Sequence, residues 1–257
     1  MTVPQRSASA PRRPGIAIGT RGARRDVLQE QAVTLRAVIF DWRGTLVSGL
    51  SEQRWVQEAL ALLGREAGLQ TVEGVLAAIA QADGPEHRLD APGMDTDAAL
   101  HRRSFFGVLQ DAGLDRPLVE ALYAVESDPG HNPFAEDVAS TLEALHAAGL
   151  RLALLSDIHF DLRPAFHAAG LSDLIDVFVL SFEHGLQKPD PVLFARTLTA
   201  MGTQAHETLM VGDRAGPDGP AVEQGIPTLL LPPLEHPAQR RLHHVLALTG
   251  LASHRST

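Results

Sequence analysis

Short apolar runs alternate with amphipathic segments along most of the chain. The apolar runs are rich in Val, Ile, Leu and Phe, which is typical of buried strands, and they lie at residues 37–40, 151–155, 177–180, 208–211 and 228–231. The segments between them show helical spacing or end in Gly, and they predict helices at 137–148, 161–169, 191–201, 221–224 and 240–248. Strands that alternate with helices form parallel βαβ units with right-handed crossovers. The sequence therefore predicts an α/β fold with a Rossmann-like parallel sheet.

A different pattern fills the stretch between the first and second predicted strands. From residue 51 to residue 127 the apolar residues recur at helical spacing in four groups, with little strand signal between them. This pattern predicts an all-helical domain at 51–130, inserted into an α/β core made of residues 35–50 and 131–257. Residues 1–34 are rich in Pro, Arg, Ser and Gly without sustained periodicity, and they predict a disordered tail.

Composition narrows the possible functions. The net charge of −9 argues against a general nucleic-acid binder, because counterion release requires clustered basic residues. No apolar stretch approaches the roughly 20 residues that span a bilayer, and the first 30 residues lack the apolar segment of a secretory signal, so we expect no membrane partner and a cytoplasmic location. The chain has no cysteine, so a metal ion would be held by oxygen or imidazole ligands.

Residues suited to chemistry follow several of the predicted strands. Asp41 follows the first strand, Ser156 and Asp157 end the second, and Asp213 follows the strand at 208–211. The carboxyl edge of an open α/β sheet is where ligands bind, so these positions favour an active site. Lys188 is the single lysine among 22 basic residues, which favours a role that a guanidinium would fill poorly.

Four motifs contain these residues. FDWRGTLV (40–47), LLSDIHF (154–160), GLQKPDPVLF (185–194) and MVGDRAGPDGPAVEQG (210–225) together resemble, in order, the four motifs of the haloacid dehalogenase superfamily of hydrolases. The resemblance covers residues 35–232, with the helical domain in the place of that family's mobile helical cap. It implies a Mg²⁺-dependent phosphatase that acts on a small phosphorylated metabolite.

The resemblance also assigns the nucleophile and the metal ligands. Asp41 would attack phosphorus and form an aspartyl-phosphate. Mg²⁺ prefers carboxylates, water and phosphate oxygens, and its ligands would be Asp41, Asp213 and the backbone carbonyl of Arg43, with Asp218 holding a water on the ion.

Further residues would contact the phosphoryl group. Ser156, with the backbone amides of Asp157 and Ile158 beside it, would hydrogen-bond the transferring oxygens, and Thr45 would orient them. Lys188 would neutralise the negative charge of the nucleophile and the phosphoryl group. Arg214 would lie close to the phosphate as a further basic group.

One position departs from the family pattern. The phosphatases carry a second Asp two residues after the nucleophile, which protonates the leaving group, and here that position is Arg43. A guanidinium, with a pKa above about 12, cannot transfer a proton near neutral pH. A phosphatase of this kind would act on a substrate with a good leaving group, or His131, Asp157 or His159 would handle the proton. Arg43 would then act as an electrostatic clamp on the phosphate.

Two other functions are compatible with the sequence. The family's dehalogenases also lack the second Asp, because a halide leaves without protonation, so hydrolysis at carbon is one alternative. A catalytically weak or inactive ligand-binding protein with the same fold is the other. Substrate contacts would come from the helical domain, where several basic residues could serve: Arg54, His87, Arg88, His101, Arg102 and Arg103.

Overall fold

The computed structural model describes residues 34–251, and all but one residue of the predicted tail at 1–34 lie outside this part of the chain. Five parallel strands form one sheet in the order β3-β2-β1-β4-β5. The strands are β1 (Ala37–Phe40), β2 (Arg151–Ser156), β3 (Val177–Leu180), β4 (Thr208–Gly212) and β5 (Thr228–Leu230). The predicted Rossmann-like α/β fold is confirmed.

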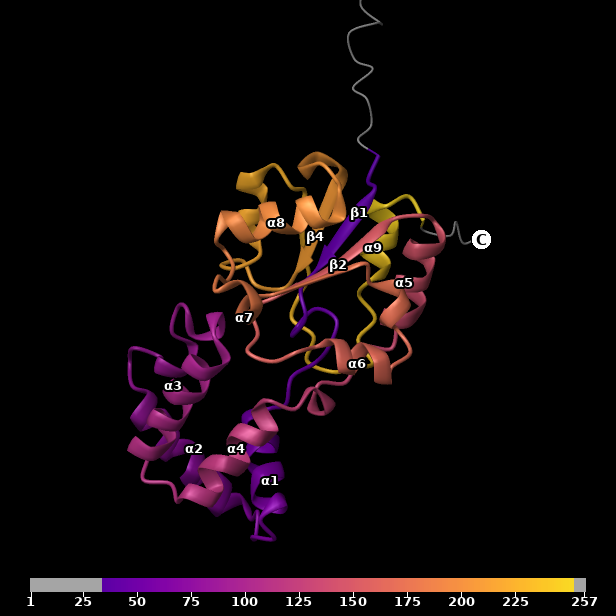
Figure 1. Ribbon diagram of the computed structural model, residues 1–257. Helices are drawn as coiled ribbons and strands as arrows, with labels where there is room; N and C mark the ends of the chain where they lie inside the picture. Colours follow the sequence, from indigo (N-terminus) through magenta and orange to yellow (C-terminus); the bar gives the residue numbers. More distant parts are fainter. Residues whose placement is uncertain (1–33, 252–257) are drawn as a thin grey trace, which may run out of the picture. The chain divides into compact units, whose positions relative to one another are not determined.

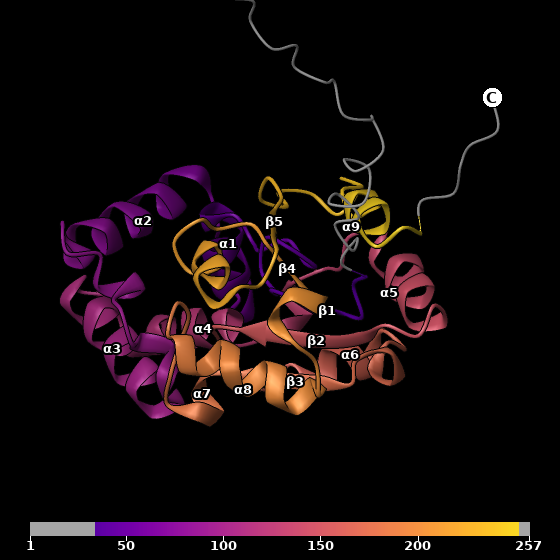
Figure 2. The ribbon, with the colours of Figure 1, turned by 90° about the horizontal axis from the view of Figure 1, so that it is seen from above.

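Helices cover both faces of the sheet (Figures 1 and 2). Successive residues of a strand point to opposite faces, so β1 contributes Val38 and Phe40 to one hydrophobic cluster and Ala37 and Ile39 to another. The first cluster is completed by α5 (Val138–Ala147), α6 (Arg163–Ala168) and α9 (His243–Leu248). The second is completed by α8 (Pro191–Met201) and the 3₁₀ helix η6 (Gly219–Gln224). A strand that is buried on both faces has an uninterrupted apolar sequence, and residues 37–40 of β1 show this pattern.

Four α-helices lie between β1 and β2. They are α1 (Glu52–Leu62), α2 (Leu69–Asp83), α3 (Ala98–Asp111) and α4 (Arg116–Glu126), and residues 51–130, all of them described, contain no strand. These helices share their own hydrophobic cluster, which includes Val56, Leu109 and Leu122. We call residues 51–127 the helical insert; its standing as a separate cap domain stays a prediction.

Side-chain caps fix where three of these helices begin. Ser51, Asp97 and Asp115 accept hydrogen bonds from the backbone N–H groups three residues further on. Such caps satisfy backbone donors that the first helical turn leaves unpaired. Two short 3₁₀ helices connect α2 to α3, namely η1 (Arg88–Asp90) and η2 (Met94–Thr96).

The segment that contains η1 and η2 contacts the core near the carboxyl edge of the sheet. The Gly93 N–H donates a hydrogen bond to Gln187 Oε1 over 2.9 Å. Ser181, the first residue of α7 (Ser181–His184), donates its hydroxyl proton to the Asp95 carbonyl over 2.6 Å. Three further 3₁₀ helices lie in the core: η3 (Pro129–His131), η4 (Ser172–Leu174) and η5 (Ala205–Glu207).

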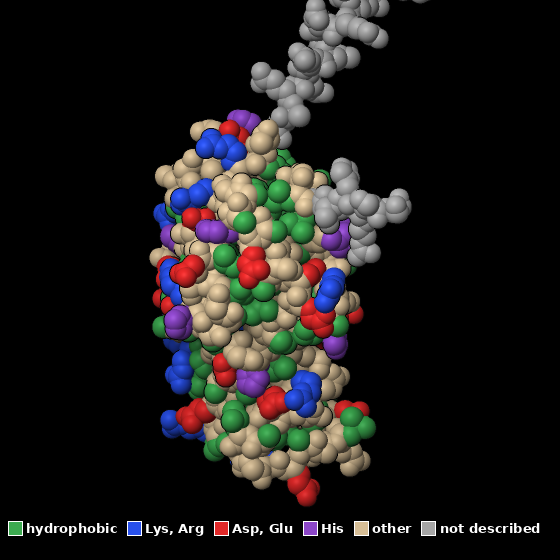
Figure 3. All heavy atoms as spheres, turned by 90° about the vertical axis from the view of Figure 1, so that its right-hand side faces the viewer, with side chains coloured by type: hydrophobic (Ala, Val, Ile, Leu, Met, Phe, Trp, Pro, Cys, Tyr) green, Lys and Arg blue, Asp and Glu red, His purple; other side chains and the backbone are tan. Residues whose placement is uncertain are grey.

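The surface in Figure 3 carries acidic, basic and hydrophobic side chains in a mixed pattern. Within residues 34–251, no helix combines the length and hydropathy that crossing a membrane requires.

Candidate active site

Asp41 stands directly after β1, and a tight turn follows it. The Trp42 carbonyl accepts hydrogen bonds from the N–H groups of Thr45, Leu46 and Val47, which turns the chain back on itself. Gly44 adopts a φ of 79°, and a Cβ there would lie 2.3 Å from Asp213 Oδ2. Only glycine allows this close approach of the turn to the Asp213 carboxylate, which follows the neighbouring strand β4.

Lys188 joins two buried carboxylates. Its Nζ donates to Asp41 Oδ1 and to Asp218 Oδ1, each over 2.6 Å, and its side chain has no exposed surface. Burial opposes the charge, but Asp41 and Asp218 outweigh it and raise the pKa of Lys188 above its ordinary value. Lys188 is therefore charged and holds the Asp41 carboxylate in one orientation.

Three carboxylates converge at this place. Oxygens of Asp41, Asp213 and Asp218 all lie within 4.8 Å of one another. Asp218 Oδ2 accepts hydrogen bonds from the N–H groups of Asp213 and Arg214 over 3.2 and 3.1 Å, and Thr45 Oγ1 donates to Asp213 Oδ1 over 3.2 Å. Burial and the charges of Asp41 and Asp218 raise the pKa of Asp213 to about 6. Three carboxylates against one ammonium leave excess negative charge, so this oxygen donor set fits a hard divalent cation.

The end of β2 faces the same space. Ser156 is buried, and Asp157 Oδ1 accepts the Lys188 backbone N–H over 2.8 Å. Burial raises the pKa of Asp157 to about 6. The Ile158 N–H, expected to contact a phosphoryl oxygen, instead donates to Ser181 Oγ over 2.8 Å, so that donor is already used.

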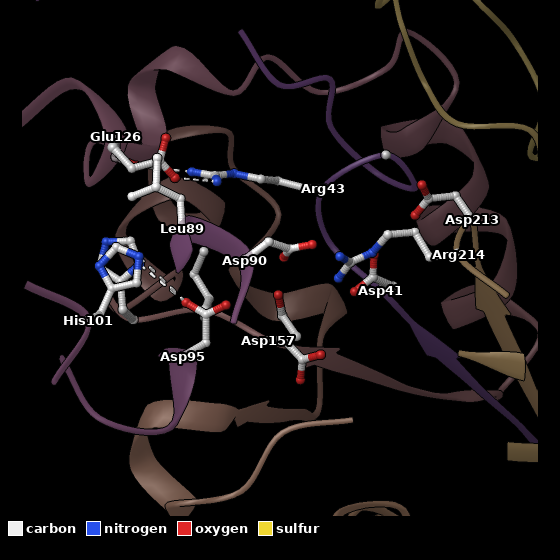
Figure 4. Close-up of a pocket in the computed structure, with 14 residues that line it drawn as sticks. Asp41, Arg43, Leu89, Asp90, Asp95, His101, Glu126, Asp157, Asp213 and Arg214 are labelled. Carbon is white, nitrogen blue, oxygen red and sulfur yellow. Dashed lines mark hydrogen bonds and ion pairs between the residues drawn. The ribbon is translucent and has the colours of Figure 1, made fainter. Parts of the chain in front are cut away.

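Arg43 is directed away from Asp41 and toward the helical insert (Figure 4). Its Nη1 donates to Glu126 Oε1 over 2.6 Å and its Nη2 to the Glu126 carbonyl over 3.0 Å. Its Nε donates to Asn132 Oδ1 over 3.0 Å. The guanidinium thus connects the loop after the nucleophile to both the last turn of α4 and the segment that returns to the core.

A cavity of about 330 Å³ lies between the core and the helical insert. Its core side is lined by Asp41, Arg43, Gly44, Ser156, Asp157, Ile158, His159, Asp213 and Arg214, and its insert side by Leu89, Asp90, Asp95, His101 and Glu126. Thr45, Lys188 and Asp218 do not line it and lie behind Asp41 and Asp213. His131 belongs to a neighbouring cavity beside Arg43.

A second arginine supports the Asp41 loop from behind. Arg241 is buried, and it donates from Nη1 to the Gly44 carbonyl over 3.1 Å and from Nη2 to the Thr45 carbonyl over 2.7 Å. It also donates to the Pro232 carbonyl. The helix predicted at 240–248 begins only at His243 in the structure, because Arg241 belongs to the preceding loop that packs on the Asp41 turn.

Sequence reasoning missed most of the insert's contribution. His101 is among the possible substrate contacts predicted from the sequence. The sequence does not predict Asp90, Asp95 or Glu126, because an acidic residue on a helix or short turn is usually exposed to solvent. Arg241 likewise has no motif around it. Their placement depends on how the insert and the last loop pack against the core.

Comparison with known proteins identifies the family. The sequence profile of the haloacid dehalogenase-like hydrolases matches residues 35–225. The chain therefore belongs to the haloacid dehalogenase-like hydrolase family.

Individual relatives include both phosphatases and dehalogenases. The phosphoserine phosphatase of Thermus thermophilus is 29% identical over 212 residues, which cover 72% of this chain and 83% of the relative. Haloacid dehalogenase-like hydrolase domain-containing protein 3 of Danio rerio is 30% identical and covers 70% of this chain and 78% of the relative. The crystal structure of a 2-haloacid dehalogenase from Pseudomonas syringae shares the fold with a TM-score of 0.55 and 22% identity, over 83% of this chain and 98% of that chain.

Proposed function

We propose that this hydrolase is a Mg²⁺-dependent phosphatase that acts on a small phosphorylated compound through Asp41. The observation that carries the proposal is the convergence of Asp41, Asp213 and Asp218, with the Lys188 ammonium bonded to Asp41 and Asp218. The similarity to a phosphoserine phosphatase supports the same reaction class. A cavity of about 330 Å³ suits a small metabolite rather than a macromolecule.

Asp41 supplies the nucleophile in this proposal. A carboxylate oxygen forms a bond to phosphorus while the bond from phosphorus to the leaving oxygen breaks, which gives an aspartyl-phosphate. Water then attacks phosphorus and releases inorganic phosphate and the Asp41 carboxylate. The Lys188 ammonium holds Asp41 in place throughout.

Asp41, Asp213 and the Arg43 carbonyl would hold the cation directly, and Asp218 would hold a water beside it. A bound Mg²⁺ would reduce the repulsion between the substrate phosphate and the carboxylate nucleophile. Ser156 and the Asp157 N–H would donate to the phosphoryl oxygens, and Thr45 would orient the group through Asp213. Arg214 fits the role of a phosphate ligand because it lines the cavity beside Asp41.

Proton transfer to the leaving group needs a residue other than Arg43. The contacts of Arg43 with Glu126 and Asn132 support a role in fixing the insert rather than in clamping phosphate. Of the three candidates from the sequence, His131 lies outside the Asp41 cavity, and His159 lines it next to Asp95. Asp157 fits best, because its pKa of about 6 leaves part of the population protonated near neutral pH.

The test is hydrolysis of an activated aryl phosphate with and without Mg²⁺, followed by a panel that includes phosphoserine. We expect turnover that requires Mg²⁺, and a phosphorylated protein detected by mass spectrometry after acid quenching. The variant Asp41→Asn should show neither. No turnover by the folded wild-type protein would contradict the proposal and favour a ligand-binding role, whereas halide release from 2-chloroacids without metal would select hydrolysis at carbon.

A further inference from the structure

His101 and Asp95 line the end of the cavity opposite Asp41 (Figure 4), and His159 lines the cavity as well. The rings of His101 on α3 and His159 after β2 stack with centroids 3.4 Å apart and planes 7° apart. Asp95 Oδ1 lies 3.5 Å from His159 Nδ1 and 3.9 Å from His101 Nε2. His159 Nε2 hydrogen-bonds with Ser127 Oγ over 2.9 Å. We call Asp95, His101 and His159 the distal cluster.

The distal cluster does not have the geometry of a metal site, although its donor atoms lie within 4.8 Å of one another. An imidazole binds a metal along the nitrogen lone pair, in the plane of its ring, at about 2.0–2.1 Å. Because the two rings are nearly parallel and stacked, an ion in the plane of one ring would lie well out of the plane of the other. The stacking therefore favours recognition by hydrogen bonds and charge.

The distal cluster has unused hydrogen-bonding capacity. His101 is only 5% exposed, and its Nδ1 has no partner among the residues that the structure describes. Its Nε2 lies too far from Asp95 for a hydrogen bond. The Asp95 side chain is 32% exposed, and both Asp95 and His101 line the cavity. A buried imidazole without a partner, beside a carboxylate that opens to a cavity, indicates a ligand group at this place.

The charge at the distal end is negative. Burial opposes ionisation of Asp95, but the contact with His159 outweighs it and lowers the pKa of Asp95. Burial and the neighbouring His159 lower the pKa of His101 to about 4, so His101 is neutral at physiological pH. Asp90 also lines the cavity, and its side chain forms no hydrogen bond or ion pair within residues 34–251. Glu126 is the one insert carboxylate of this cavity that an arginine neutralises.

The opposite end holds the positive groups. Arg214 lines the cavity beside Asp41, and the Lys188 ammonium lies behind Asp41. Asp41, Asp213 and Asp218 lie at the same end, so this end is suited to an anion once the proposed divalent cation is bound. The distal end is suited to a hydrogen-bond-donating cation.

We propose that the distal cluster, with Asp90, binds an ammonium group of the substrate, and that the substrates are phosphate monoesters of small amino alcohols. This proposal rests on the phosphatase function above and adds the class of leaving group to it. The Asp95 carboxylate accepts the N–H donors, and Asp90 adds a second negative charge beside it. Esters with a carboxylate or a second phosphate at that end are disfavoured, because Asp90 and Asp95 repel them.

The test compares three esters of similar size that differ in the end group: 2-aminoethyl phosphate, 2-hydroxyethyl phosphate and phosphoglycolate. We expect kcat/KM of the wild-type protein for the amino ester to exceed that for phosphoglycolate at least about 10-fold. Asp95→Asn should lower this ratio about 10-fold, chiefly through KM, and Asp90→Asn should lower it less. Glu73→Gln, which removes an exposed carboxylate of the insert that does not line the cavity, should leave the ratio unchanged.

The outcomes separate this proposal from the phosphatase function. If the protein hydrolyses the aryl phosphate but its kcat/KM for phosphoglycolate equals or exceeds that for 2-aminoethyl phosphate, only the amino-alcohol proposal is overturned. The same holds if neither Asp95→Asn nor Asp90→Asn changes the ratio of the two kcat/KM values. If no ester is hydrolysed, calorimetric titration of Asp41→Asn with 2-aminoethyl phosphate and with phosphoglycolate still tests the ammonium site. Tighter binding of 2-aminoethyl phosphate than of phosphoglycolate supports the distal site, and equal or weaker binding overturns it.

Discussion

The ammonium nitrogen of Lys188 lies 2.6 Å from a carboxylate oxygen of Asp41 and 2.6 Å from one of Asp218. Neither Lys188 nor Asp218 has any exposed side-chain surface, so bulk water does not reach either group. The ammonium is small enough to fit between two carboxylates, whereas a planar guanidinium is larger and prefers to bind one carboxylate through two parallel hydrogen bonds. This contact gives a physical reason for the lysine at position 188, although every other Lys or Arg position of the chain is an arginine.

Lys188→Met should destabilise the protein by about 3–5 kcal/mol, because it removes the cation that neutralises two buried carboxylates. We expect the free energy of unfolding in urea to fall by this amount and the phosphatase rate to be lost. Arg116→Met serves as the control, since Arg116 forms an exposed pair with Glu120 and should change stability by less than about 1 kcal/mol. If the Lys188→Met protein is as stable as the control, Lys188 does not stabilise the buried carboxylates of Asp41 and Asp218 as described.

Arg43→Asp combined with Glu126→Gln should raise the rate at which alkyl phosphates are hydrolysed, because an alkoxide is a poor leaving group that needs a proton. The double change supplies a carboxyl two residues after Asp41 and avoids placing it against the Glu126 carboxylate that Arg43 now contacts. A general acid contributes on the order of 100-fold or more, so an increase of about 100-fold is expected for alkyl esters and little for aryl phosphates. Glu126→Gln alone is the matched control. If the alkyl and aryl rates change together, the missing proton donor does not limit the wild-type protein.

The core of the site was predictable from the sequence because it follows from strand ends. Asp41, Ser156 and Asp213 each end or follow an apolar run, and parallel strands bring their carboxyl ends to one edge of the sheet. The single lysine added a fourth residue, which the structure places between Asp41 and Asp218.

The rest depends on packing that no local pattern encodes. The sequence established that Arg43 cannot transfer a proton, but its partner Glu126 lies 83 positions away on a helix that reads as amphipathic and solvated. Asp95 lies in a single turn of 3₁₀ helix, too short to show periodicity. Both contacts form only when the insert packs against the core.

Arg241→Met should lower kcat about 10-fold or more and destabilise the protein by about 1–3 kcal/mol. Arg241 acts through the Asp41 loop, because its guanidinium holds the Gly44 and Thr45 carbonyls. Losing it leaves the Thr45 carbonyl without this donor, and a displacement of the loop of about 1 Å can cost up to about 100-fold in rate. We expect kcat to fall while KM for the aryl phosphate changes little, and Arg241→Lys to recover part of the rate.

Arg240→Met is the neighbouring control for this experiment, since Arg240 forms an exposed pair with Glu136 and does not contact the loop. A merely structural role would lower stability without lowering kcat of the folded fraction. That result would contradict the positioning role.

His101 should make the protein lose stability as the pH falls from about 7.5 to about 5. Burial and His159 lower the pKa of His101 from 6.5 to about 4, although Asp95 opposes the shift. Between these pKa values the unfolded chain binds a proton on His101 that the folded chain does not, so acid favours unfolding. The wild-type free energy of unfolding should therefore fall by about 2 kcal/mol more than that of His101→Phe, which keeps an aromatic ring in the stack but cannot titrate. Urea unfolding at the two pH values measures the difference, and equal losses in the two proteins would show that the buried imidazole accepts its proton as readily in the folded state as in the unfolded one.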